Sequence, residues 1–237
     1  MGAERRVAIV TGGSHGIGAG LVAGYRAQGW AVVANARTIE PVADPDVVTV
    51  EGDIALPATA RRVLGAAIER FGHVDTLVNN AGVFIAKPFT DYTAEDYALV
   101  TGVNLAGFFW LTQLVIAEMV PRGRGHVVNI SATVAARADS SSPSVLTALT
   151  KGGLAAATRS LAIEYASRGI RVNAVSPGVI QTPMHSAASY AALGDHASPL
   201  GHPGQISDVV GGILFLETAP FITGEILHVD GGQIAGH

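Results

Sequence analysis

Thr11-Gly12-Gly13-Ser14-His15-Gly16-Ile17-Gly18 joins two segments of different character. The apolar run 7–10 before it is typical of a buried strand, and the pattern from Ile17 to Tyr25 after it is typical of a helix. The sequence therefore predicts a glycine-rich turn from a strand into a helix N-terminus. Unpaired N–H groups and the positive end of the helix dipole lie there, and glycines let a pyrophosphate approach the backbone. A tight turn that binds nothing is the alternative.

Outward from this turn, strand-like and helix-like segments alternate along the chain. The predicted strands are 7–11, 30–36, 47–50, 75–79, 126–130, 170–176 and 225–229, and the predicted helices are 16–28, 57–71, 105–119, 146–167 and 205–217. Thr93 followed by Asp96 resembles a capping box in the long helical region before 105. The alternation predicts an α/β fold with a doubly wound, mostly parallel sheet and helices on both faces. We expect one domain over 1–237, with a loop at 131–145.

The composition limits the classes of function. The chain has 237 residues, no cysteine, 49% hydrophobic residues and a formal net charge of −4. The missing cysteines exclude a disulfide framework and a cysteine zinc site, and we expect no metal. No basic stripe is present, so we expect no nucleic-acid partner. No apolar run approaches membrane-spanning length, and the N-terminus lacks a signal-peptide core and a myristoylation signal, so we expect a cytoplasmic protein without a membrane partner.

Further short motifs follow the glycine turn in a fixed order. They are Asp53-Ile54, Asn79-Asn80-Ala81-Gly82, Asn104, Asn129-Ile130-Ser131, Lys151, Pro177-Gly178, Thr182-Pro183, Thr223-Gly224 and Asp230-Gly231-Gly232. With these motifs the chain resembles the short-chain dehydrogenase/reductase family, in its compact single-domain branch, over nearly its whole length.

The resemblance implies a Rossmann-type sheet of about seven strands that holds NAD or NADP at the carboxyl ends of the strands. It implies that the glycine turn holds the pyrophosphate, that Asp53 and Ile54 bracket the adenine, and that 177–182 wraps the nicotinamide end. The cofactor-binding residues it implies are Gly12, Ser14, His15, Gly16, Ile17, Gly18, Arg37, Asp53, Ile54, Asn80, Ala81, Gly82, Lys151, Pro177, Gly178, Val179 and Thr182.

The end of the second strand bears on the choice between NAD and NADP. Family members that prefer NAD have an acid there, which accepts a hydrogen bond from the ribose 2′-hydroxyl. Here the position is Ala36, and Arg37, which follows, can pair with a 2′-phosphate. His15 lies within reach of the same phosphate. A solvated strand-end charge at Arg37 and a bystander role for His15 are the alternatives, and we favour NADP(H).

The chain departs from the family at the proton donor. Family reductases protonate the substrate oxygen with a tyrosine four residues before the lysine, and here that position is Thr147 before Lys151. Thr147 and Lys151 lie on one face of a helix at this spacing. A threonine hydroxyl is a much weaker acid than a phenol, whose pKa is about 10. Direct substitution of the tyrosine by Thr147 is therefore not expected.

The serine that contacts the carbonyl in the family is also replaced. Counting from Asn129 places it at Ala132, whereas counting back from Lys151 places it at Val134. Ser131 or Thr133 could supply a hydroxyl from a shifted backbone, and capping of the strand end is the alternative for both.

Several groups could supply the proton instead. We expect catalytic roles for Lys151, Asn104, Ser131 and His185, with His185 first among the alternative acids because histidine titrates near neutral pH. A solvated loop histidine is the alternative. A water held by Lys151 and Asn104 is another route, and the remaining candidates are Asp139, Ser140, Ser141, Ser142, Tyr190 and His196. The segment 182–203 is expected to form a mobile substrate lid.

The sequence favours an NADPH-dependent reductase of a ketone on a small molecule, with non-standard proton donation. A heterocyclic or nucleoside-like ketone of a specialised pathway, such as antibiotic biosynthesis, is one candidate substrate. A member that has lost redox chemistry and works as a cyclase, dehydratase or isomerase is the first alternative, and a nucleotide-binding protein without catalysis is the second. The resemblance also implies a homodimer or homotetramer built on the apolar helices 105–119 and 146–165.

Overall fold

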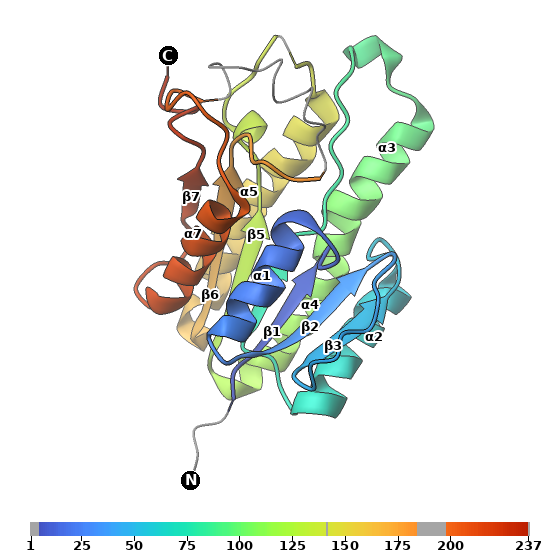
Figure 1. The fold of residues 1–237 in the computed structure, drawn as a ribbon, viewed down its shortest axis with the longest axis vertical. Helices are drawn as coiled ribbons and strands as arrows, with labels where there is room; N and C mark the ends of the chain where they lie inside the picture. Colours follow the sequence, from blue (N-terminus) through green and yellow to red (C-terminus); the bar gives the residue numbers. More distant parts are fainter. Residues whose placement is uncertain (1–4, 141, 184–197, 237) are drawn as a thin grey trace.

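Seven parallel strands form one sheet in the computed structural model, which describes residues 5–140, 142–183 and 198–236 (Figure 1). Their order is β3-β2-β1-β4-β5-β6-β7, and each neighbouring pair is parallel. The chain therefore builds outward in opposite directions from β1 and β4, which creates a switch point at the carboxyl ends of these two strands. The strands are β1 (Val7–Thr11), β2 (Ala31–Ala36), β3 (Val47–Glu51), β4 (Thr76–Asn79), β5 (Gly125–Ile130), β6 (Ile170–Pro177) and β7 (Ile226–Val229).

Helices cover both faces of the sheet. The helices α1 (Gly16–Ala27) and α7 (Ile206–Thr218) lie on one face, and α2 (Pro57–Phe71), α4 (Gly107–Met119) and α5 (Val145–Tyr165) lie on the other (Figure 1). Successive strand residues point to opposite layers: Ile9 and Leu77 pack under α2 and α4, whereas Val10 and Val78 pack under α1 and α7. Burial on both faces explains why the strands are apolar without alternation.

The predicted α/β fold and all seven predicted strands are confirmed. The strand β2 begins at Ala31 and not at Trp30, because the Trp30 N–H donates a hydrogen bond to Tyr25 O in the turn that ends α1. The predicted loop at 131–145 contains a short 3-10 helix. The described 3-10 helices are Phe89–Asp91, Val120–Arg122, Thr133–Ala135 and Ala166–Arg168.

The long helical region is more continuous than the sequence indicates. The helix α3 (Ala94–Thr101) begins at the expected capping box, in which the Thr93 hydroxyl accepts from Asp96 N and the Asp96 carboxylate accepts from Thr93 N. A π-helical turn (Gly102–Ala106) joins α3 to α4.

This continuity corrects one expectation. The helical stretch Ala94–Arg122 is long and apolar enough, by length and composition alone, to cross a membrane. The expectation that no apolar run reaches that length is therefore wrong. Packing explains the apolar character, because Leu111, Val115 and Met119 of α4 lie in the core against the sheet.

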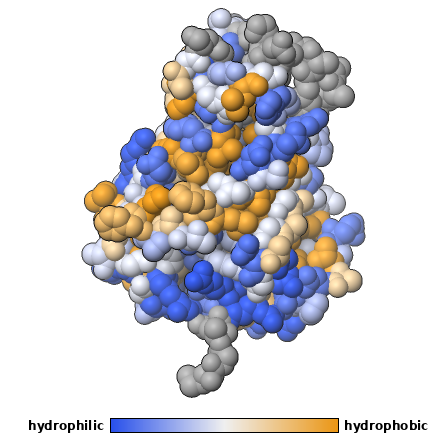
Figure 2. Space-filling view, turned by 60° about the vertical axis from the view of Figure 1, so that its left-hand side comes forward, coloured by the Kyte–Doolittle hydropathy of each residue, from blue (hydrophilic) through white to orange (hydrophobic). Residues whose placement is uncertain are grey.

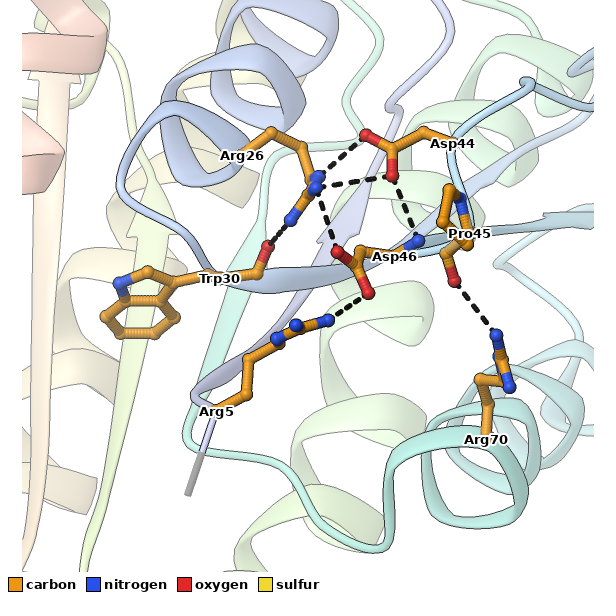
Figure 3. A network of polar contacts seen from close by, with 7 residues as sticks. All are labelled: Arg5, Arg26, Trp30, Asp44, Pro45, Asp46 and Arg70. Carbon is orange, nitrogen blue, oxygen red and sulfur yellow. Dashed lines mark hydrogen bonds and ion pairs between the residues drawn. The ribbon is translucent and has the colours of Figure 1, made fainter. Parts of the chain in front are cut away.

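A network of charged residues fixes the loop between β2 and β3 (Figure 3). Arg26 of α1 donates from Nε to Asp44 Oδ2 at 2.8 Å and from Nη2 to Asp46 Oδ2 at 3.0 Å. Arg5 pairs with the same Asp46, and Arg70 of α2 donates to Pro45 O at 3.1 Å. The hydrogen bond from Arg26 lowers the pKa of Asp44. The distal part of this loop is thus held between two helices, and its first residues follow the end of β2.

A buried carboxylate lies on the α1 and α7 side of the sheet. Glu217 of α7 accepts hydrogen bonds from Tyr25 Oη at 2.7 Å and Thr76 Oγ1 at 3.1 Å, and pairs with His126 Nδ1 at 3.1 Å. Burial acts to raise the pKa of Glu217, but the charge of His126 and these hydrogen bonds outweigh it, so the pKa is lowered. The network ties α1 and α7 to β4 and β5.

Candidate active site

A cavity of about 1250 Å³ lies at the carboxyl ends of the strands. Every residue predicted to bind the cofactor lines it: Gly12, Ser14, His15, Gly16, Ile17, Gly18, Arg37, Asp53, Ile54, Asn80, Ala81, Gly82, Lys151, Pro177, Gly178, Val179 and Thr182. All but Lys151 come from the ends of five strands and the segments that follow them. The switch point of the sheet thus brings together residues that are up to 170 positions apart (12 to 182).

The glycine turn needs its glycines. Gly12 and Gly16 have φ angles of 66° and 57°, which favour residues without a Cβ atom. A Cβ on Gly18 would lie 1.9 Å from Gly12 O. Asn80 after β4 holds the turn, because its Nδ2 donates to Thr11 O at 2.8 Å. No side chain caps the N-terminus of α1, so its first N–H groups face the cavity without an internal side-chain partner.

The wall beside the end of β2 is basic. Arg37 and His15 both line the cavity, and His15 Nδ1 lies 2.9 Å from Ser14 Oγ. Ala36, which ends β2, brings no carboxylate. This part of the cavity therefore has the charge that suits a phosphate.

The adenine wall that the resemblance implies is built from the loop after β3. Asp53 Oδ1 accepts from Ala55 N at 2.9 Å, which closes the turn before α2. Ile54 is buried against α4, where a Cβ on Gly107 would come within 2.9 Å of Ile54 Cγ2. The position of Ile54 is thus fixed by close packing.

Lys151 and Thr147 also line the cavity, one helical turn apart on α5. Lys151 Nζ donates to Ile130 O at 2.6 Å, and burial lowers the pKa of this ammonium to about 8. The Thr147 side chain is buried, and its Oγ1 has no hydrogen-bond partner among the described residues. A buried hydroxyl of this kind normally finds a partner.

Comparisons with known proteins agree on one family. A family model described as enoyl-(acyl carrier protein) reductase matches residues 12–233. The "putative ketoacyl reductase 2" of the granaticin polyketide synthase of Streptomyces violaceoruber is 37% identical over 97% of this chain and 96% of its own. The chain belongs to the short-chain dehydrogenase/reductase family. It is therefore related to oxidoreductases over nearly its whole length.

Solved structures show the same fold. A short-chain dehydrogenase/reductase from Mycobacterium marinum has a TM-score of 0.91 and 27% identity, covering 98% of this chain and 96% of its own. ElxO with NADP bound has a TM-score of 0.88 and 26% identity, covering 98% of this chain and 100% of its own.

The serine candidates of this short-chain dehydrogenase/reductase lie near Lys151. The cavity is lined by Ser131, Ala132, Thr133 and Val134. Both positions expected for the family's serine, Ala132 and Val134, therefore lie on the cavity wall. Ser131 Oγ donates to Lys151 O at 3.2 Å and is buried. Because of this bond, the Ser131 hydroxyl proton is already donated to the backbone of α5. Thr133, on the adjoining 3-10 helix, is the other hydroxyl candidate.

Asn104 lies behind the cavity and does not line the wall formed by the residues above. Its Nδ2 donates to Val83 O at 3.0 Å and to Thr150 Oγ1 at 3.1 Å, and its Oδ1 accepts from Val83 N at 2.8 Å. Both amide hydrogens are thus committed. In this structure Asn104 joins the π-helical turn, the segment after β4 and α5.

The structure describes only some of the other candidates. His185, Tyr190 and His196 lie outside the described residues, as does most of the expected lid 182–203 and Ser141. Asp139 and Ser142 line the cavity. Of the expected lid 182–203, the structure describes 182–183 and 198–203, and Thr182 lines the cavity. Among the described residues no group of three or more His, Asp or Glu side chains is placed to hold a metal ion.

Sequence reasoning missed several lining residues. They are Thr38, Val83, Phe84, Arg137 and Gln233. Arg137 donates from Nη1 to Gln233 O, so it joins the loop after β5 to the C-terminal segment. Neither residue belongs to a family motif or to a periodic pattern, and only the fold brings them to the cavity.

Proposed function

We propose that this protein is an NADPH-dependent reductase that converts a ketone on a small molecule to an alcohol. One observation carries the proposal: a single cavity joins the glycine turn, Arg37 and Lys151. The structural neighbour ElxO supports it, because ElxO has been solved with NADP bound and a variant of ElxO with NADPH bound.

The residues of the cavity fit the nucleotide. The uncapped N-terminus of α1 would bind the pyrophosphate, and Arg37 with His15 would bind the 2′-phosphate. Asp53 and Ile54 would hold the adenine, and 177–182 with Lys151 would hold the nicotinamide end. NADPH supplies a hydride when it is bound. The protein must bind and orient the ketone, exclude water and deliver a proton.

The substrate class is inferred from the relative and from the cavity wall. The granaticin relative carries the name of a ketoacyl reductase of a polyketide synthase, which supports a polyketide-like ketone as the substrate. Apolar Phe84 and Val134 line the cavity together with polar Arg137 and Gln233. A heterocyclic or nucleoside-like ketone is a second candidate substrate and is tested as well.

The test is NADPH oxidation by the purified protein with cyclic, acyl-thioester and heterocyclic ketones. With at least one of these classes of ketone, we expect one molecule of alcohol to form for each molecule of NADPH oxidised. Tight NADPH binding without oxidation by any ketone would overturn the proposal.

A non-redox activity is the second candidate, and Thr147 at the tyrosine position favours it. A cyclase, dehydratase or isomerase would form product without consuming NADPH. Mass spectrometry of the same reaction mixtures, with and without NADPH, separates the two candidates.

We also propose a homodimer or homotetramer. Several apolar side chains of α4 and α5 are exposed: Phe109 is 51%, Leu149 is 59% and Ile163 is 80% exposed. Figure 2, which brings the side of α7 and β7 forward, shows a hydrophobic area between hydrophilic ones, and α7 carries the exposed Phe215. Analytical ultracentrifugation with Ile163→Glu and Leu149→Glu tests the proposal, since these variants should shift the protein toward monomer.

A further inference from the structure

We infer that Thr147 and Lys151 together hold a water molecule that passes a proton from Lys151 to the oxygen of the reduced ketone. The inference rests on the proposed reductase function. It assigns two roles to α5: Lys151 is the source of the proton, and Thr147 positions the water that carries it.

The Thr147 hydroxyl is buried at the cavity wall without a partner. Thr147 is only 2% exposed, it lines the cavity, and its Oγ1 has no hydrogen-bond partner among the described residues. Leaving a buried hydroxyl unpaired costs free energy, because the group loses its hydrogen bonds to water and gains none in the protein. A polar ligand atom or a bound water at this point of the cavity would remove that cost.

The Lys151 ammonium has hydrogens left to donate. Within the described part of the chain its Nζ makes one hydrogen bond, to Ile130 O, and an ammonium has three hydrogens. A Cβ on Gly82 would lie 3.2 Å from Nζ, so this glycine keeps the ammonium free of a side chain. Burial lowers the pKa of Lys151 to about 8, which keeps it protonated at neutral pH but makes it a better acid than a solvated lysine.

Two donors close to this part of α5, Ser131 and Asn104, are already committed. The Ser131 hydroxyl donates to Lys151 O, and both Asn104 amide hydrogens donate to Val83 O and Thr150 Oγ1. The Asn104 amide nitrogen therefore has no hydrogen left to donate to a relay water. Thr147 offers a hydroxyl on the same helix face as Lys151.

Atoms and electrons balance in the proposed reduction. The carbonyl π bond breaks, and the carbon gains a C–H bond from the hydride supplied by NADPH. The oxygen gains an O–H bond from the water, the water regains a proton from Lys151 Nζ, and Lys151 is left neutral until solvent reprotonates it. The ketone is reduced by two electrons, and NADPH is oxidised by two.

The test compares Thr147→Val, which keeps the shape and removes the hydroxyl, with Thr147→Ser, which keeps the hydroxyl. We expect Thr147→Val to lower kcat about 100-fold and Thr147→Ser to retain kcat within about tenfold. The Kd for NADPH, from fluorescence titration, should change less than twofold in both. Thr90→Val, at an exposed site before α3, is the matched control and should leave kcat unchanged.

Two further measurements test the relay without relying only on the magnitude of kcat. The kcat of the wild type should fall as pH rises through about 8, and this limb should be lost in Thr147→Val. A high-resolution crystal structure should show a water between Thr147 Oγ1 and Lys151 Nζ that is missing in Thr147→Val.

The outcomes distinguish a failure of the proton relay from a failure of the proposed reductase function. A wild type that oxidises no NADPH with any ketone would overturn both. An active wild type with a fully active Thr147→Val would overturn the relay alone and turn attention to His185.

Discussion

A Cβ atom on Gly18 would lie 1.9 Å from the carbonyl oxygen of Gly12. The two glycines therefore touch across the turn that leads from β1 into α1. This contact fixes the first N–H groups of α1 against the cavity, and it explains why this position has no side chain.

Gly18→Ala is predicted to disrupt the turn. The Cβ would also lie 2.7 Å from Asn80 Nδ2, so the turn and the end of β4 must both shift. We expect a loss of about 1–3 kcal/mol in the free energy of unfolding and a Kd for NADPH at least tenfold higher. Urea unfolding and fluorescence titration measure the two effects.

Gly65→Ala is the matched control within a helix. A Cβ on Gly65 of α2 would meet nothing within 4 Å. This variant should gain about 0.5–1 kcal/mol, because alanine is the better helix former. Similar losses in both variants would contradict the explanation.

Arg37→Leu is predicted to change the choice of cofactor. Arg37 lines the basic end of the cavity, and a charged hydrogen bond to a phosphate contributes about 1.5–3 kcal/mol. We therefore expect the Kd for NADPH to rise about 10- to 100-fold and the Kd for NADH to change little. Titration with both nucleotides measures the difference.

Arg168→Leu, in the 3-10 helix Ala166–Arg168 that precedes β6, removes the same charge at the end of the sheet away from the glycine turn. It should leave both affinities unchanged at moderate salt. If Arg37→Leu raised the Kd for NADPH and the Kd for NADH equally, Arg37 would bind a part that the two nucleotides share and not the 2′-phosphate.

The sequence predicts the fold well because the sheet is buried on both faces. Runs such as Val7–Thr11 are apolar almost throughout, so continuous apolar runs that end in turn residues locate the strands. The continuous helix from α3 through α4 was harder to predict. Its π-helical turn (Gly102–Ala106) has no local signal, and the apolar residues of α4 surround the helix because some face the core and others, such as Phe109, are exposed.

Some residues of the candidate site can likewise be predicted from the sequence, and others cannot. The residues proposed to bind the cofactor follow from motifs at strand ends, where backbone geometry restricts the residue type. The residues proposed to contact the substrate come from the loop after β5 and from the C-terminal segment, so Arg137 and Gln233 meet only in the folded chain. The Thr147 substitution is visible in the sequence, whereas the unpaired state of its hydroxyl is a property of packing.

Tyr25→Phe is predicted to destabilise the protein through Glu217. Tyr25 is fully buried, and its hydroxyl donates to Glu217 Oε1 at 2.7 Å. Removing that donor from a buried carboxylate should lower the free energy of unfolding by about 1–3 kcal/mol. Tyr97→Phe, at a side chain that is 56% exposed, should change it by no more than about 0.5 kcal/mol. Equal effects in urea unfolding would show that Glu217 does not depend on this donor.

Lys151 is predicted to make stability depend on pH. Burial lowers its pKa from 10.5 to about 8 in the folded protein, so between these values the unfolded chain binds more protons than the folded one. The free energy of unfolding should therefore rise with pH across this window, by on the order of 3 kcal/mol in total. Below pH 8 the cost of burying the ammonium is fully present.

Lys151→Met isolates this effect, because methionine fills similar space without a charge. The variant should lack the rise between pH 8 and 10.5, and near neutral pH it should be more stable than the wild type. The gain is reduced by the lost hydrogen bond to Ile130 O, which contributes about 1–3 kcal/mol. The difference between wild type and variant in urea unfolding cancels the titration of other groups. A difference that stays constant with pH would show that Lys151 keeps an ordinary pKa in the folded protein, and it would remove the electrostatic support for the proton relay.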